Sequence, residues 1–135
     1  MSQENVEAFR RAVAAVNRGD VDGVLDELDS EVEWHPLAQM MLGGHETVYR
    51  GHDGVRELFR ELDEVTDGIH PQISEIRDLG DRIVAIGRIR AQGRESEAET
   101  ESPIGWVAEY QNGKMIRIRD YIDPQEALEA VGLTE

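Results

Sequence analysis

The spacing of apolar residues predicts three helices in the first half of the chain. Over residues 3–18 they recur every three or four positions, as in an amphipathic helix: Val6, Phe9, Val13 and Val16. A Gly19-Asp20 pair then supplies a turn and an N-cap for a second, shorter helix that ends near residue 29. A third apolar stripe begins near Asp53 and predicts another helix, with Val55, Leu58, Phe59, Leu62 and Val65 on one side.

The second half of the chain shows the alternation of apolar and polar residues that is typical of strands. A short strand is already predicted over residues 31–35, where Pro36 ends it. Asn112-Gly113 is a strong hairpin signal between two of the later strands. The later strands are predicted over residues 69–79, 82–91, 103–111 and 115–122.

The order of these elements indicates an α+β fold, with helices first and a meander of antiparallel strands afterwards. The pair Asp123-Pro124 has the features of an N-cap and a first helical proline, so a last short helix is expected over residues 124–131. Residues 1–135 are expected to form one domain. Helices that cover a curved sheet leave a cone-shaped cavity, a favoured place for a small ligand. The long connection over residues 37–51 is expected to be a lid or a pocket wall.

Composition excludes several kinds of partner and site. The 135 residues include no cysteine, so disulfides, thiolate nucleophiles and cysteine-based metal sites are excluded. The four histidines have no close metal-ligand spacing, and we predict no metal and no cofactor. The formal net charge of −15 opposes binding to nucleic acids and to anionic lipid. The sequence shows neither a signal peptide nor an apolar run long enough for a membrane span, and a cytoplasmic protein is expected.

The last predicted strand contains the strongest candidate for chemistry. Read with period two, its isoleucines point to one face, and Asp120 is in phase with them. A carboxylate on an apolar face must be paired, protonated or at the edge of a wet cavity. If the strand phase carries through Arg88, that side chain also faces inward and could pair with Asp120. Such a pair would be either a structural ion pair or a base assisted by an arginine.

Three segments give the chain a resemblance to the SnoaL-like branch of the NTF2-like superfamily, which is related to ketosteroid isomerases and limonene epoxide hydrolases. They are Asn17-Arg18-Gly19-Asp20, Tyr49-Arg50-Gly51-His52-Asp53-Gly54, and Asn112-Gly113-Lys114 leading to Arg119-Asp120-Tyr121-Ile122-Asp123. The resemblance covers nearly the whole chain and implies a cone-shaped α+β fold, a strongly bent antiparallel sheet wrapped by helices. Because this fold hosts many reactions, its members' activities must be tested residue by residue.

The activities that the resemblance brings with it fit this chain unequally. The ketosteroid isomerase positions correspond to Ala12, Trp34-His35 and Gly105, so that activity is rejected unless His35 replaces the base. The epoxide hydrolase pattern is half present, since Arg88 and Asp120 match but the tyrosine and asparagine on the first strand are missing. SnoaL-type polyketide cyclases use an aspartate on the last strand as a base, and Asp120 resembles it. These cyclases also use a nearby histidine, and the matching position in this chain is apolar.

Further side chains are candidates for a ligand pocket. Arg88 or Arg90 could hold a developing negative charge, and His35, at the end of the first strand, is a candidate base. Apolar and aromatic candidates for ligand contact are Trp34, Tyr49, Phe59 and Trp106, with core or lid packing as the alternative for each.

Three functions remain open from the sequence. The first is a SnoaL-like enzyme that acts on a small apolar carbonyl compound through Asp120. The second is a binding protein for small molecules without catalysis, and the third is a dimeric interaction module with a filled cone. By analogy with relatives, a homodimer through the outer sheet face is expected.

Overall fold

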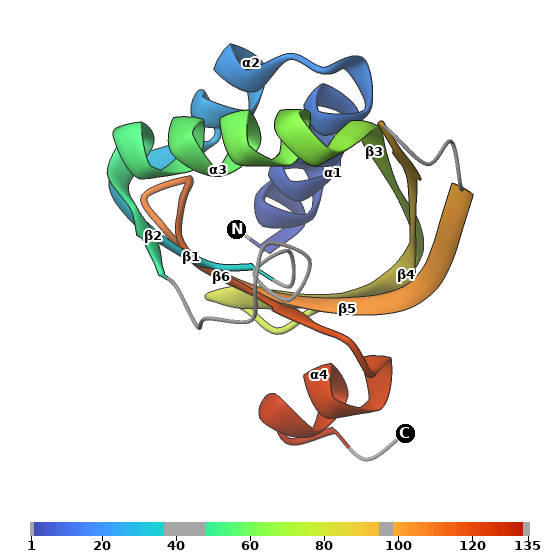
Figure 1. Cartoon of the computed structure of the whole chain (residues 1–135). Coiled ribbons are helices and arrows are strands. Elements are labelled where there is room, and N and C mark those ends of the chain that lie inside the picture. Colours follow the sequence, from blue (N-terminus) through green and yellow to red (C-terminus); the bar gives the residue numbers. More distant parts are fainter. Residues whose placement is uncertain (1, 37–47, 95–98, 134–135) are drawn as a thin grey trace.

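The computed structural model describes residues 2–36, 48–94 and 99–133 of the chain (Figure 1). The expected pocket wall at 37–51, which includes His45, therefore lies mostly outside the described residues. Ten elements follow one another in the order predicted, with one addition: a short strand, β2, precedes the third helix. Helices come first and the strands of a sheet follow, so the α+β prediction is confirmed.

Three of the four predicted helices have nearly the expected bounds. The second helix ends at Leu25 rather than near residue 29, because the first strand already begins at Leu28. Helix α1 spans Ser2–Arg18, α2 spans Val21–Leu25 and α3 spans Gly51–Val65. The Asp20 carboxylate accepts a hydrogen bond of 2.9 Å from the Gly23 backbone N–H, which confirms it as the N-cap of α2. Helix α4 spans Pro124–Ala130, and Asp123 caps it by accepting from the Gln125 N–H.

Six strands form one sheet in the order β2-β1-β6-β5-β4-β3. Their bounds are Leu28–His35 for β1, Tyr49–Arg50 for β2, Thr66–Asp78 for β3, Arg82–Gly93 for β4, Glu99–Gln111 for β5 and Lys114–Tyr121 for β6. The sheet is not purely antiparallel as expected, because β1 runs parallel to β6. This pairing joins the first strand to the last and places Trp34 beside Ile118.

Helices cover the sheet unequally on its two faces. Helices α1 and α3 lie across the concave face, where β3, β4 and β5 curve around them (Figure 1). Buried side chains from α1 and from the inner side of the strands, among them Phe9, Ile83, Ile104 and Met115, form the main core.

Helix α4 packs on the opposite, outer face of the sheet against β4 and β5 (Figure 1). Ala127 and Leu128 bury themselves against Val84 and Val107 there. Gly105 makes the approach close enough, because a Cβ at this position would stand 2.6 Å from the Ala127 Cβ. The outer face therefore has a small apolar core of its own under α4.

Candidate functional site

A cavity of about 420 Å³ lies between the helices and the concave face of the sheet. Its volume falls within the roughly 300–1,000 Å³ that is usual for small-molecule sites. Its wall is mostly aliphatic and aromatic, with contributions from α1, α3 and five of the strands: Phe9, Val13, Leu58, Phe59, Ile69, Ile89, Ile104 and Ile118 are examples. Such a surface favours an apolar ligand.

Asp120 brings a carboxylate to this apolar wall. It lines the cavity together with Ile118 and Ile122, so the predicted strand phase is confirmed. On β5, Trp106 is its partner in register and also lines the cavity. The Asp120 Oδ1 atom is shielded from solvent. Among the described residues that line the cavity, Asp120 is the only one with an ionisable side chain.

Three of the four aromatic candidates line the cavity. Trp34 and Phe59 meet edge to face, with ring centroids 5.8 Å apart, and Trp106 meets Phe9 in the same way at 5.9 Å. The Trp34 indole N–H is buried and finds no acceptor among the described residues. A buried donor in this state costs free energy, so an acceptor that reached it would be bound favourably.

Tyr49, the fourth aromatic candidate, lies behind the cavity wall. Its side chain is 8% exposed and packs against Leu58 and Leu62, which do line the cavity. Its hydroxyl points to α3 and donates a hydrogen bond of 2.5 Å to Glu61 Oε1. Burial, together with this bond and the charge of Glu61, raises the pKa of Tyr49 to about 12. Its place in the structure is that of a support for the wall.

The expected inward orientation of Arg88 is wrong. On β4 it is Ile89 and Ala91 that line the cavity, so Arg88 and Arg90 lie on the other face of the strand. Arg88 pairs with Glu101 there at 3.4 Å, and Arg90 approaches Glu99 at 3.6 Å. Both guanidinium groups are about half exposed. Neither arginine therefore shares the cavity with Asp120.

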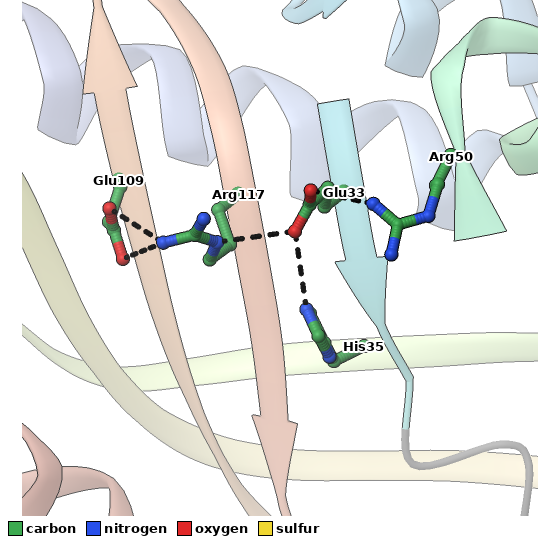
Figure 2. Close-up of polar contacts among 5 residues, drawn as sticks. All are labelled: Glu33, His35, Arg50, Glu109 and Arg117. Atoms are coloured by element: carbon green, nitrogen blue, oxygen red, sulfur yellow. Dashed lines mark hydrogen bonds and ion pairs between the residues drawn. The ribbon is translucent and has the colours of Figure 1, made fainter. Parts of the chain in front are cut away.

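His35 also lies on the outer face, because its neighbours Trp34 and Pro36 take the inward positions on β1. Its Nε2 atom stands 3.7 Å from Glu33 Oε1, and Figure 2 shows both side chains within a row of charged groups. This orientation leaves His35 outside the described lining of the cavity, and its role as a base stays a prediction.

The row in Figure 2, which we call the outer charge row, crosses four neighbouring strands: Arg50, Glu33, Arg117 and Glu109, with His35 beside Glu33. Glu33 bonds Arg50 at 2.7 Å and lies 3.5 Å from Arg117, which reaches Glu109 at 3.3 Å. Partial burial raises the pKa of the Glu33 carboxyl, but the bond and charge of Arg50 and Arg117 outweigh it and leave that pKa below its ordinary value.

Sequence reasoning missed two hydroxyl groups and a second cavity. Thr100 and Ser102 line the main cavity from β5, just before the strand that the sequence predicts over residues 103–111. Only the pairing of β5 with β4 places Ser102 beside Ile89, and no local pattern in the sequence marks it. A smaller cavity of about 270 Å³ lies where α1 and α3 end.

The described residues contain neither a candidate metal site nor a candidate membrane-spanning helix. No group of three or more histidine, aspartate or glutamate side chains among them could hold a metal ion. None of the helices in this part of the chain combines the length and the apolar character that a membrane crossing requires.

Comparison with solved structures identifies close matches of the fold. An NTF2-like protein of unknown function from Burkholderia pseudomallei K96243 is 25% identical, with a TM-score of 0.79 over 96% of this chain and 98% of that one. TerC, co-crystallised with polyporic acid, is 24% identical, with a TM-score of 0.80 over 93% and 96% of the two chains. A candidate polyketide cyclase from Xanthomonas campestris pv. campestris is 18% identical, with a TM-score of 0.72 over 97% and 98%.

A search among curated proteins gives no match. The SnoaL-like domain family, in contrast, matches residues 9–118, from the middle of α1 to the middle of β6. The cone, its internal cavity and the NTF2-like neighbours agree with that match. The chain is therefore a member of the SnoaL-like family within the NTF2-like superfamily.

Proposed function

We propose that the protein is a SnoaL-like enzyme that transfers a proton on a small apolar carbonyl compound, with Asp120 as the base. The observation that carries this proposal is the position of Asp120, whose carboxylate belongs to the wall of an otherwise apolar cavity. An apolar ligand that fills the cavity would displace water and bring a C–H group to this carboxylate. General bases of this kind contribute roughly 10²–10⁴-fold to a rate.

The proposed reaction starts with removal of a proton from the carbon next to the carbonyl. Asp120 takes the proton. The C–H electron pair forms the new C=C bond, and the π electrons of the carbonyl group move to its oxygen, which becomes the enolate oxygen. The oxygen needs a donor, and the Trp34 N–H and the Ser102 hydroxyl are the candidates in the described wall, since the Thr100 hydroxyl donates to the Ala91 carbonyl. The enolate then regains the proton at carbon or attacks a second carbonyl within the same molecule.

The relatives support a small organic ligand as the class. One structural neighbour is a candidate polyketide cyclase, and TerC was co-crystallised with polyporic acid. Sequence identities of 18% and 24% support a shared fold only. The proposed chemistry therefore depends on Asp120 and the cavity.

Solvent deuterium exchange provides the test. Incubation of 2-tetralone in D₂O with the native protein should accelerate loss of its α-proton signals in ¹H NMR. Asp120→Asn should lower that acceleration at least about 100-fold. Glu109→Gln is the matched control, since it removes a carboxylate from the outer charge row, and Arg88→Gln tests the outer arginine. Equal acceleration by the native protein and Asp120→Asn would refute Asp120 as the base.

Binding without catalysis is the second candidate, and the outward orientation of Arg88 and His35 favours it. The chain has two tryptophans, Trp34 and Trp106, and both line the cavity. Intrinsic fluorescence therefore reports cavity occupation directly. If 2-tetralone changes the fluorescence and no exchange occurs, the protein is a binding protein.

We further propose that two copies associate through the outer charge row. Two surfaces of a chain with a net charge of −15 repel one another in general. This row alternates in sign across four strands, so a two-fold axis could set each arginine against a glutamate of the second copy (Figure 2).

Light scattering after size-exclusion chromatography tests this association. The native protein should have the mass of two chains, and Arg117→Glu should shift it toward one. Arg56→Glu, which reverses an exposed charge paired with Asp22 between α3 and α2, is the control. A native mass of one chain, or loss of the dimer in the control alone, would overturn the proposal.

A further inference from the structure

The second cavity, which we call the helix-end cavity, shares a wall with the main one. It is bounded by the end of α1, the start of α2, the end of α3 and the start of β3. Five apolar side chains line both cavities: Val16, Val24, Phe59, Leu62 and Ile69. Phe59 is the largest of them, and its ring is held edge to face against Trp34. The two spaces are therefore neighbours separated by side chains rather than by backbone.

The two cavities differ in chemistry. The main cavity is apolar apart from Asp120, Thr100 and Ser102. The helix-end cavity, in contrast, has mostly polar and charged side chains in its wall: Asn17, Arg18, Asp20, Asp63, Thr66, Asp67 and His70. Asn17 fixes one side of it, since its Nδ2 donates to the Pro71 carbonyl at 2.9 Å and its Oδ1 stands 3.2 Å from His70 Nδ1. A molecule that extends from one space into the other would meet an apolar region first and a polar one second.

The charge of the helix-end cavity favours a cation. Helices α1 and α3, of 17 and 15 residues, both end at this cavity, and the C-terminal end of a helix carries partial negative charge. Two of the three aspartates in the wall are already engaged, Asp20 with Arg18 at 3.1 Å and Asp67 with Arg94 at 2.9 Å. The exposed Asp63 makes no ion pair with another described residue, so its carboxylate is available to a ligand.

We propose that the helix-end cavity is a subsite for the protonated amine end of an elongated apolar ligand, and that the Phe59 ring controls passage from the main cavity. The apolar body occupies the main cavity, and an alkyl segment passes Phe59 to place the ammonium group near Asp63. This inference rests on the proposed role of the main cavity as a ligand site. It adds the class of ligand and a residue that determines its length.

Paired probes of one length test the amine subsite. Octylammonium should bind about two- to fivefold more tightly than 1-octanol, which is the usual size for a solvent-accessible ion pair. The preference should decrease at high salt. Asp63→Asn should abolish it, whereas Asp26→Asn should keep it, because Asp26 is exposed and lines neither cavity. Tryptophan fluorescence measures both dissociation constants.

Chain length tests the Phe59 partition. Phe59→Leu keeps an apolar side chain but removes the ring, and circular dichroism checks that it folds. Octylammonium should then bind about fourfold more tightly for each further methylene that becomes buried, whereas butylammonium should change little. Equal changes for both lengths would overturn the partition.

A different pattern among the variants would refute the amine subsite. If Asp120→Asn abolishes the ammonium preference and Asp63→Asn does not, the amine lies in the main cavity and the subsite is refuted. Deuterium exchange into 2-tetralone, which has no amine, tests Asp120 alone. Failure of the subsite is thus distinguishable from failure of the proposed proton transfer.

Discussion

The charged side chains on the inner and outer faces of the sheet have different surroundings. On β6, Ile118 and Asp120 face the cavity, while Arg117 lies in the outer charge row and Arg119 stacks over Tyr121 at 5.6 Å. Arg117 and Arg119 thus each have a carboxylate or an aromatic ring beside them. The inner face presents one carboxylate in an apolar surrounding.

This difference teaches that orientation, more than residue type, separates candidate chemistry from surface charge. Arginine and histidine are common in active sites, yet on the outer face Arg88 belongs to an exposed pair and His35 to a half-buried one. Exposed pairs contribute only about 0–1 kcal/mol to stability. Removal of a buried side chain on the inner face should lower the free energy of unfolding much more, and the following substitutions measure this difference.

The largest expected effect is on the inner face. Phe9 is 2% exposed and packs against Trp106, so Phe9→Ala should lower the free energy of unfolding by about 3–5 kcal/mol. Arg117→Ala, on the outer face, should cost about 1 kcal/mol or less. Urea denaturation of the two variants measures the contrast. Comparable losses would mean that the outer charge row contributes to stability as strongly as the core does.

The outer face has one region where a small change should also be costly. Gly105→Ala places a methyl group against Ala127, and overpacking of this kind costs about 1–3 kcal/mol. In an Ala127→Gly background the cost should decrease, because the nearest opposing atom is gone. Gly105→Ala at no cost in the native background would show that α4 is not held closely to the sheet.

The helix α4 also explains why part of the site could not be predicted. Periodicity and capping signals located nearly every element, and the isoleucine phase of β6 placed Asp120 correctly. On β4, Val84 and Ile86 pack on the outer face under α4, while Ile83 and Ala85 pack on the inner one. With both faces apolar, the alternation disappears, so the phase of Arg88 could not be read from the sequence.

The bounds of the cavity required long-range information. Thr100 and Ser102 are polar and exposed, and only their pairing with β4 brings them to the mouth. The helix-end cavity is formed by two stretches that are far apart in the sequence, residues 16–24 and 59–70, and no local pattern marks it. An aromatic residue such as Tyr49 is typical of a ligand contact, but its packing against α3 places it behind the cavity wall.

Tyr49 provides the smallest and last test, at the boundary between the two environments. Its pKa of about 12 lies above the ordinary value of 10, so between these pH values the unfolded chain loses a proton that the folded protein keeps. Stability from this group is complete below pH 10 and is lost as the pH rises toward 12. By pH 11.5, about 1.5 units above the ordinary pKa, the loss should be about 2 kcal/mol, since one pKa unit corresponds to about 1.4 kcal/mol. Urea denaturation of the native protein and Tyr49→Phe at pH 8 and pH 11.5 should show the native advantage shrinking. A constant difference would mean that the hydroxyl titrates in the folded protein as it does in water.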